Sequence, residues 1–473
     1  MSRLPTIIDT LKGRRVTVMG LGMFGGGVGA VEFLFQQEAD VTVTDLRGAE
    51  VLSASLKEID RLEQQYGAKS SVVSGEHRSQ DFLDADLIVV NPAVPRSSEF
   101  LALAESNNVP LTSEMNLFWS RNPAKTIGVT GSNGKSTTTA LIHSILKNAG
   151  VSCWLGGNIG QSLLPVVDQI RSDDWVVLEL SSFQLEDLDR IEASPNIAVV
   201  TNLTPNHLDR HGTIEEYRRC KQTIVRWQSD RDTAVLNGDD NDVSAWPSNG
   251  HRVYFGQDRT NGNGVYDNRN DSAQIVEGNQ TREFPLAKHL KVPGQHNFSN
   301  AMGAIAAALA AGVGLDQVGP GIAAFSGLPH RLQLVGEYEG RRFYNDSIAT
   351  TPESSIAALQ AIDAPIVLLA GGYDKKIDLS PMVDAIAENA RAVALMGQTA
   401  TQLQQLLKTN NEQTNTKVCS NFPESFEWAW QISRPGDAVL LSPGCASYGW
   451  FDSFVDRGRQ FAAAYDNLVR RHE

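Results

Sequence analysis

The chain has 473 residues and a formal net charge of −14, with 41% hydrophobic and 20% charged residues. This length exceeds one ordinary hydrophobic core, so about three domains are expected. The composition is typical of a globular protein in water, and the acidic balance argues against a broad basic face that would bind nucleic acid.

Cysteines are few and isolated, without a CxxC pair or a Cys/His cluster of zinc spacing: Cys153, Cys220, Cys419 and Cys445. Such cysteines are usually small buried hydrophobes. The pattern predicts free thiols in a reducing compartment.

Targeting and membrane signals are weak. Residues 1–15 lack the apolar core of a signal peptide, and the most apolar helix-like segment, 301–314, is too short to span a bilayer. We therefore expect a cytoplasmic protein that does not enter a membrane. Because nothing in the sequence requires a partner chain, we expect a monomer.

Short β-branched runs alternate with helix-like segments along the chain. Strands are predicted at residues 14–20, 39–45, 86–94, 124–131, 174–182, 196–203, 231–237, 364–372, 391–397 and 437–444. Helices are predicted at residues 29–37, 136–150 and 301–314. The alternation predicts α/β domains, in which helices cover both faces of parallel sheets.

Turn residues near 110–125 and near 327 divide the chain into three predicted domains. These are a Rossmann-like domain at 1–115, a central phosphate-loop domain at 116–327 and a C-terminal Rossmann-like domain at 328–473. Residues 257–282 are rich in Asn, Asp and Gly, which predicts a surface loop with a short hairpin.

The first glycine loop, "GLGMFG" at 20–25, fits G-x-G-x-x-G and lies between a predicted strand and a predicted helix. Asp45 ends the next strand, 20 residues after Gly25. Glycines let the backbone approach a pyrophosphate at a helix N-terminus, and the carboxylate can accept from a ribose hydroxyl. The loop predicts a nucleotide-diphosphate site without fixing the base; a tight turn without a ligand is the alternative.

The second glycine loop, "TGSNGKS" at 130–136, departs from a strict Walker A motif, because Val129 stands where the first glycine belongs. Gly134, Lys135 and Ser136 keep the chemistry of the motif. Backbone N–H groups cradle phosphates, the lysine neutralises them and the serine hydroxyl reaches Mg²⁺. This loop predicts an ATP site.

Two further segments fit an ATP centre. Glu179 ends an apolar strand, where a Walker-B carboxylate belongs, and Asn206, His207 and Asp209 follow another strand at its C-terminal end. A solvent-facing glutamate and an ordinary loop histidine are the alternatives. Two nucleotide-type sites suit an enzyme that uses ATP to activate a nucleotide-tethered substrate.

Several motifs together carry a resemblance: "GVTGSNGKSTTT", "GGNIG", "LELSSFQLE", "NHLDRHG", "PGQHNFSN", "GLPHR" and "LLSPGCASYGWFDSFVDRG". They resemble the Mur ligase family over all three predicted domains. "ELSSFQLE" and the "CAS…F…F…RG" ending are most similar to the branch that adds D-glutamate to UDP-N-acetylmuramoyl-L-alanine (UDP-MurNAc-L-alanine). The resemblance implies that ATP converts a carboxylate into an acyl phosphate, which an amine then attacks, during synthesis of peptidoglycan precursors.

The resemblance implies an ATP site made of Gly131, Ser132, Asn133, Gly134, Lys135, Ser136, Thr137, Asn297, Asn300, Arg331 and Asp346. It implies Mg²⁺ ligands at Ser136, Glu179, His207 and Lys221, and catalytic roles for Lys135, Glu179, His207 and Lys221. Lys221 would be carbamylated; an ordinary surface lysine is the alternative. A carbamate offers the oxygen ligands that Mg²⁺ prefers.

The resemblance also implies two substrate sites. The UDP substrate would contact Gly22, Met23, Phe24, Asp45, Arg47, Asn158 and Ser181. The incoming amino acid would contact Thr350, Lys375, Ser447 and Phe454, although a phenylalanine there also fits a core aromatic. Lys375 would pair with a carboxylate of that amino acid.

One departure concerns the acceptor amino acid. The family often has a lysine in the stretch that here reads "NDSIAT", where Ile348 removes a positive charge. L-Glutamate or another acidic amino acid is therefore the near alternative. An NAD-dependent dehydrogenase has no use for Lys135 and Glu179, and the intact set of catalytic residues argues against an inactive nucleotide-binding protein.

Overall fold

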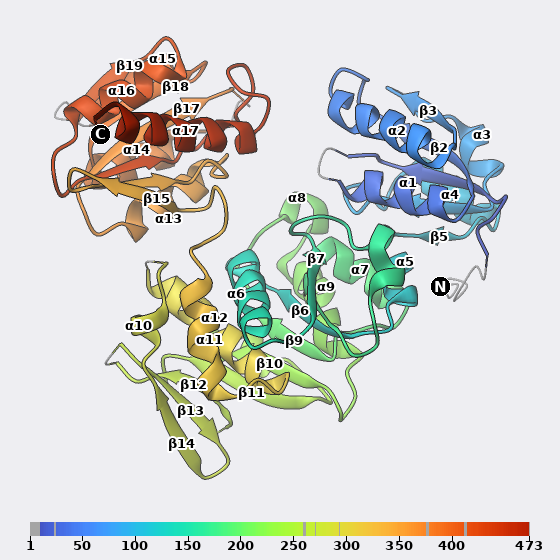
Figure 1. The fold of residues 1–473 in the computed structure, drawn as a ribbon. Coiled ribbons are helices and arrows are strands. Elements are labelled where there is room, and N and C mark those ends of the chain that lie inside the picture. The colour runs from blue at the N-terminus through green and yellow to red at the C-terminus, as the bar shows by residue number, and fades with distance from the viewer. Residues whose placement is uncertain are drawn as a thin grey trace. The chain divides into compact units, whose positions relative to one another are not determined.

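The computed structural model describes residues 10–22, 25–258, 262–269, 271–292, 294–374, 378–410 and 414–472 (Figure 1). They contain three sheets, each flanked by helices. The chain divides into two compact units, one of Met1–His289 with Ser299–Ala324 and one of Leu290–Phe298 with Phe325–Glu473. The first unit holds two sheets and the second holds one.

The N-terminal sheet is parallel and has the strand order β3-β2-β1-β4-β5. Its strands are β1 (Arg15–Met19), β2 (Asp40–Asp45), β3 (Ser70–Ser74), β4 (Leu87–Val90) and β5 (Leu111–Thr112). Helices α1 (Gly26–Gln36) and α2 (Ser53–Tyr66) share a core with Val16 and Val18, whereas α3 (Ser79–Leu83) and α4 (Glu99–Ser106) share one with Met19. The order reverses between β1 and β4, where ligands of open α/β sheets bind.

The central sheet has nine strands in the order β14-β13-β12-β11-β10-β9-β6-β8-β7. They are β6 (Lys125–Thr130), β7 (Cys153–Gly157), β8 (Trp175–Glu179), β9 (Ile197–Val200), β10 (Thr233–Asn237), β11 (His251–Gly256), β12 (Gly264–Asp267), β13 (Ala273–Glu277) and β14 (Gln280–Phe284). The helices of this region are α5 (Glu114–Arg121), α6 (Lys135–Asn148), α7 (Ser182–Arg190), α8 (Leu208–His211), α9 (Ile214–Arg226), α10 (Leu286–His289), α11 (Gln295–Ala310) and α12 (Leu315–Ala324).

The prediction of a surface loop with a short hairpin at 257–282 is correct about the hairpin, but the segment also extends the central sheet instead of forming a loop. Strand β12 extends the sheet in parallel to β11, and β13 and β14 add two antiparallel strands. Val265, Tyr266 and Ile275 are buried on these strands. These few apolar side chains are enough to form strands, although the segment as a whole is polar. The predicted hairpin is formed by β13 and β14, which pair in antiparallel.

The C-terminal sheet has the order β15-β16-β20-β17-β18-β19, with only β15 antiparallel to its neighbour. Its strands are β15 (Gln333–Tyr338), β16 (Arg341–Asn345), β17 (Ile366–Gly372), β18 (Ala390–Gly397), β19 (Asn415–Val418) and β20 (Ala438–Leu441). Helices α13 (Pro352–Ala361), α14 (Ser380–Asn389) and α15 (Ala400–Asn410) cover one face, and α16 (Phe422–Ile432) and α17 (Phe454–His472) the other. The predicted α/β class with parallel sheets is confirmed.

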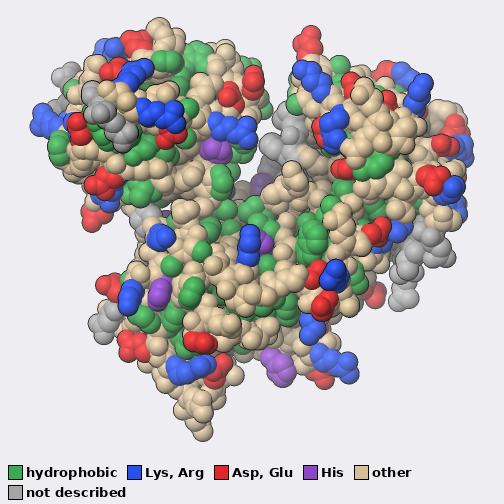
Figure 2. Space-filling view, in the orientation of Figure 1, with side chains coloured by type: hydrophobic (Ala, Val, Ile, Leu, Met, Phe, Trp, Pro, Cys, Tyr) green, Lys and Arg blue, Asp and Glu red, His purple; other side chains and the backbone are tan. Residues whose placement is uncertain are grey.

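The surface charges and the state of the cysteines agree with the composition. Acidic and basic side chains are interspersed over the face shown in Figure 2. All four cysteines are free, and three of them are buried. Among the described residues, no helix combines the length and apolar character needed to cross a membrane.

Candidate active site

The second glycine loop connects β6 to α6 and is shaped by two left-handed glycines. Gly131 has φ 147° and Gly134 has φ 82°. A Cβ atom at Gly134 would lie 2.3 Å from Asn300 Oδ1, and one at Gly131 would lie 1.9 Å from Thr201 Oγ1. Val129 is a fully buried residue of β6, paired with Glu179 on β8, so the loop turns only after it. The position at which a strict Walker A motif has its first glycine is thus occupied here by a residue of strand β6.

The loop after β9 forms hydrogen bonds with the phosphate loop. Asn202 Oδ1 accepts from Asn133 N at 2.9 Å, and Asn202 Nδ2 donates to Asn133 O at 3.1 Å. Lys135 Nζ donates to Gly131 O at 3.1 Å and Ser132 O at 2.9 Å. Ser136 and Thr137 follow in the first turn of α6, whose N-terminus favours an anion. These contacts fix the conformation of the loop at the N-terminus of α6.

Glu179 lies at the C-terminal end of β8 and is only 3% exposed. Its Oε1 accepts from Asn158 Nδ2 at 2.9 Å, whereas its Oε2 has no hydrogen-bond partner among the described residues. A buried carboxylate oxygen without a partner is costly unless a cation completes its shell. This orphaned oxygen fits a hard cation such as Mg²⁺. Asn158, predicted to contact substrate, here orients Glu179.

Lys221 lies on α9 and is 1% exposed, which contradicts the surface-lysine alternative. Its Nζ donates to Gly131 O at 2.8 Å and Thr130 Oγ1 at 3.2 Å. Burial, helped by the charge of Lys135, holds the pKa of this amine well below its usual range. A lowered pKa favours the neutral amine, which is the form that reacts with CO₂. Carbamylation itself stays a prediction.

His207 precedes α8 in a left-handed conformation, φ 53°, which is uncommon for a residue with a side chain. Its ring lies 5.3 Å from the ring of Phe183 and 6.4 Å from that of Tyr217. Lys221 Nζ lies 4.8 Å from the same Tyr217 ring, and the Tyr217 hydroxyl lies 3.2 Å from Ser132 Oγ. Tyr217 therefore lies beside two predicted metal ligands, His207 and Lys221, and also contacts Ser132 of the phosphate loop.

Sequence reasoning missed Tyr217, although it stands four residues before Lys221 on one face of α9. Among the described residues, no group of three or more His, Cys, Asp and Glu side chains is placed to hold a metal. A cation here would therefore complete its shell with other oxygen ligands, such as Ser136, water or phosphate oxygens.

The first glycine loop lies beside a charged pair. Asp45 Oδ2 accepts from Gly22 N at 3.2 Å, and Arg47 Nε and Nη2 donate to its two carboxylate oxygens at 3.0 and 2.8 Å. Burial alone would raise the pKa of Asp45, but the hydrogen bonds from Arg47 and Gly22 outweigh it and lower that pKa. Asp45 and Arg47 thus present an ordered charged pair at the loop. Met23 and Phe24 lie outside the described residues.

Ser181 does not point freely toward a ligand. It caps α7, with its Oγ accepting from Gln184 N at 3.3 Å and Gln184 Oε1 accepting from Ser181 N at 3.0 Å. This capping box begins the helix directly after Glu179. Contact with the sugar side of a substrate stays a prediction for Ser181.

On α11, the predicted adenine contacts Asn297 and Asn300 are both buried near the start of the helix. In the C-terminal domain, Asp346 Oδ1 accepts from Leu332 N at 3.0 Å and Oδ2 accepts from Ser442 Oγ at 2.8 Å. Burial raises the pKa of Asp346 to about 6. The carboxylate therefore stabilises its own loop, and its predicted ribose contact stays untested. Arg331 is exposed.

The predicted amino-acid contacts lie on loops of the C-terminal domain. Thr350 is half-buried between β16 and α13, and Ser447 is buried after β20. Phe454 begins α17, and its ring lies 6.4 Å from that of His330. Lys375 lies outside the described residues.

Arg457 is fully buried and was not predicted. Its guanidinium donates to Ser347 O at 2.8 Å, Ser347 Oγ at 3.0 Å and Cys445 O at 3.1 Å. It thereby joins the two loops that carry Thr350 and Ser447. Burial lowers the pKa of Arg457 to about 10, so the guanidinium stays charged at neutral pH.

Arg457→Met should destabilise the C-terminal domain by about 3 kcal/mol, because buried acceptors left without donors cost about 1–3 kcal/mol each. Urea unfolding followed by tryptophan fluorescence would measure the loss, since Trp428, Trp430 and Trp450 all lie in this domain. The exposed Arg434→Met is the matched control, with an expected change within about 0.5 kcal/mol. Equal midpoints for the two variants would refute the role of Arg457.

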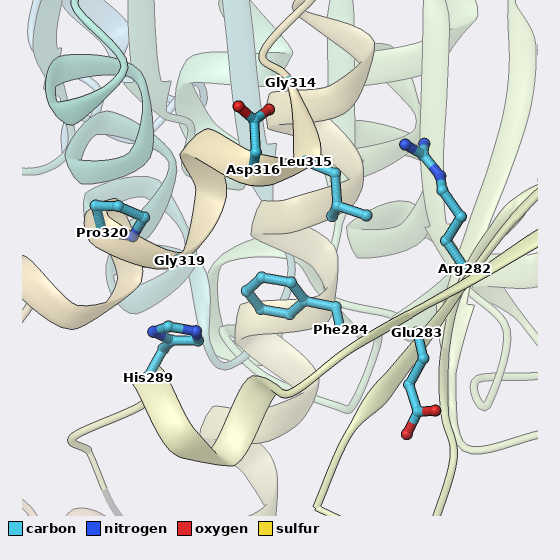
Figure 3. Close-up of a pocket in the computed structure, with 9 residues that line it drawn as sticks. All are labelled: Arg282, Glu283, Phe284, His289, Gly314, Leu315, Asp316, Gly319 and Pro320. Carbon is cyan, nitrogen blue, oxygen red and sulfur yellow. The ribbon is translucent and has the colours of Figure 1, made fainter.

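A separate pocket of about 570 Å³ opens between β14, α10 and α12 (Figure 3). Phe284 and His289 stack along it, with ring centroids 5.4 Å apart. None of the predicted site residues lines it. The predicted site residues around the phosphate loop lie elsewhere in the structure.

A phosphate loop, with a buried carboxylate ending a neighbouring strand, places the chain among the α/β enzymes that bind nucleoside triphosphates. Three family models match it: "Mur ligase MurD-like, N-terminal domain" at residues 14–113, "Mur ligase middle domain" at 129–308 and "Mur ligase, glutamate ligase domain" at 330–445. The chain therefore belongs to the Mur ligase family.

Curated relatives indicate which members of the Mur ligase family the chain resembles. A protein of Roseiflexus sp. (strain RS-1), named UDP-N-acetylmuramoylalanine--D-glutamate ligase, is 39% identical over 97% of this chain and 100% of its own length. A protein of the same name from Acetivibrio thermocellus is 36% identical over 97% of each chain. Among solved structures, UDP-N-acetylmuramate-alanine ligase MurC from Thermotoga maritima matches with a TM-score of 0.62 and 20% identity, over 96% of this chain and 100% of that chain. The structural match supports the fold.

Proposed function

We propose that this chain joins D-glutamate to UDP-MurNAc-L-alanine in an ATP-dependent reaction of peptidoglycan precursor synthesis. The observation that carries the proposal is the full-length similarity to curated relatives bearing that name, at 39% and 36% identity. Those relatives do not favour the L-glutamate alternative. Ile348 is thus a local variation on the amino-acid side, and its backbone N donates to His330 O at 3.0 Å.

The chemistry proceeds in two steps. A carboxylate oxygen of the substrate's L-alanyl group attacks the γ-phosphorus of ATP, and ADP leaves. The amine of D-glutamate then attacks the acyl-phosphate carbon, phosphate leaves with the carbon–oxygen electron pair, and the nitrogen loses a proton. Phosphorylation is needed because a carboxylate is a poor electrophile.

We assign the charge-stabilising roles to residues of the phosphate-loop region. Lys135 would neutralise the transferring phosphoryl group, and the amides of 131–136 would bind the phosphates. Glu179, His207, Ser136 and a carbamate on Lys221 would hold Mg²⁺. When bound, Mg²⁺ supplies Lewis-acid stabilisation of the phosphate oxygens. The orphaned Oε2 of Glu179 and the buried amine of Lys221 support this assignment.

The remaining assignments follow the same logic. The first glycine loop would bind the diphosphate of the UDP substrate, and the C-terminal loops around Thr350 and Ser447 would bind D-glutamate. Free thiols fit the reducing cytoplasm, where we place the enzyme as a monomer.

Phosphate release across a panel of amino acids tests the function. The protein is incubated with ATP, Mg²⁺ and UDP-MurNAc-L-alanine, and each amino acid is added in turn. We expect phosphate release and a new amide product with D-glutamate, and little with L-glutamate. Release with L-glutamate alone would replace the proposed substrate, and no release with any amino acid would reject the ligase reaction.

A further inference from the structure

The β4–α4 loop, residues 91–98, contacts the first glycine loop. Asn91 N donates to Met19 O at 2.9 Å, directly before Gly20. A Cβ atom at Gly20 would lie 2.9 Å from Asn91 Cβ and 3.1 Å from Val94 Cγ2. The β4–α4 loop therefore packs directly against the loop that would bind the substrate diphosphate, at the reversal point of the N-terminal sheet.

Arg210 holds this loop from the central domain. Its Nη1 donates to Ala93 O at 2.9 Å, and its Nη2 donates to Pro92 O at 3.2 Å and Val94 O at 2.5 Å. Three successive carbonyls thus meet one guanidinium. A planar fork with several fixed donors makes this possible, whereas a lysine ammonium presents one compact point charge.

The same guanidinium also packs on the aromatic cluster around His207. Arg210 Cζ lies 5.1 Å from the centroid of the Phe183 ring. That ring stacks on His211 at 5.1 Å and meets His207 edge-on at 5.3 Å. Arg210 therefore contacts the β4–α4 loop and the surroundings of a predicted metal ligand at once.

A second interaction attaches the β4–α4 loop to the central domain. Arg96 forms an ion pair with Asp187 on α7, and the Asp187 side chain is 3% exposed. The helix that carries Asp187 begins directly after Glu179 and Ser181. The β4–α4 loop is thus attached at two points to elements that carry the proposed ATP chemistry.

We propose that Arg210 is a positioning residue for the ligation. By holding the carbonyls of 92–94, it sets the distance between the first glycine loop, which would bind the diphosphate, and the ATP site, where the far end of the same substrate reacts. This inference rests on the proposed function. A substrate bound at one end and reacting at the other depends on this register, because a misplacement of about 1 Å can cost about 10²-fold in rate.

Arg210→Ala should lower kcat/KM for UDP-MurNAc-L-alanine by about 10- to 100-fold, mostly through kcat. UDP alone probes the N-terminal site, and ADP alone probes the phosphate loop. Because Arg210 is proposed to contact neither ligand, their Kd values should change by less than about twofold. Arg210→Lys should lose nearly as much activity as Arg210→Ala, since the charge remains but the fork is lost.

Two further measurements separate positioning from other roles. Amide hydrogen exchange in residues 91–98 should become faster in Arg210→Ala, and the losses from Arg210→Ala and Arg96→Gln should not multiply in the double variant, because both release one loop. The control is Arg61→Ala, whose guanidinium pairs with Glu58 within α2. It should leave kcat/KM unchanged.

Wild-type kcat/KM in Arg210→Ala, wild-type activity in Arg210→Lys or unchanged exchange in residues 91–98 would each overturn the inference. Parallel losses of UDP binding, ADP binding and thermal stability would show a merely structural residue, which also overturns it. Failure of the proposed function looks different, because the unaltered protein would then show no ligation. The exchange measurement decides the role of Arg210 in holding the loop in either case.

Discussion

Lys221→Ala should lower the ligation rate by about 10³-fold, the largest loss expected from one substitution outside the phosphate loop. The side chain is buried, donates to Gly131 O and lies over Tyr217, so no solvent-exposed group can replace it. If the amine carries a carbamate, alanine removes both a ligand for Mg²⁺ and a contact to the phosphate loop. Steady-state phosphate release with D-glutamate measures the loss.

A carbamate on Lys221 leads to two more specific expectations. Added formate or another short carboxylate should partly restore Lys221→Ala, because it can occupy the vacated space with oxygen ligands. Removing CO₂ should slow the unaltered enzyme reversibly, and bicarbonate should restore it. Lys147→Ala, at an exposed lysine of α6, is the control and should behave as wild type. Full activity in Lys221→Ala would exclude the carbamate role.

Glu179→Gln should lower kcat by about 10²-fold and raise the Mg²⁺ concentration needed for half-maximal rate. Glutamine keeps the size of the side chain and an oxygen that can accept from Asn158, so packing is preserved. It removes the negative charge from the orphaned oxygen that fits the cation. A magnesium titration of the initial rate measures both effects.

The control for Glu179→Gln is Glu277→Gln, which removes a carboxylate paired with Arg282 on the exposed β13–β14 hairpin. It should leave the magnesium titration unchanged, because surface ion pairs contribute little. An unchanged titration in Glu179→Gln would instead show that this carboxylate holds no cation.

Local patterns predicted the elements that carry the site. Alternating β-branched runs located β1, β6 and β8, because buried parallel strands are read directly as apolar runs. The glycine loops were visible for the same reason, since each follows such a strand and precedes a helix. The polar segment at 257–282 misled the prediction, because three short strands needed only a few buried side chains each.

The parts that were missed depend on distant contacts. Arg457 contacts Ser347 across 110 positions of the chain, and Arg210 contacts Ala93 across 117. No periodicity joins residues so far apart. The hydrogen bond from Asn158 to Glu179 was likewise not visible in the sequence, and the substrate contact of Asn158 stays a prediction.

Transfer of a labelled oxygen shows whether ATP activates the substrate carboxylate for attack by D-glutamate. UDP-MurNAc-L-alanine carrying ¹⁸O at both oxygens of its alanyl carboxylate is incubated with the protein, ATP, Mg²⁺ and D-glutamate, and the released phosphate is analysed by mass spectrometry. We expect one ¹⁸O atom in each phosphate and one new amide for each phosphate released. Unlabelled phosphate, or phosphate released without amide formation, would contradict this expectation.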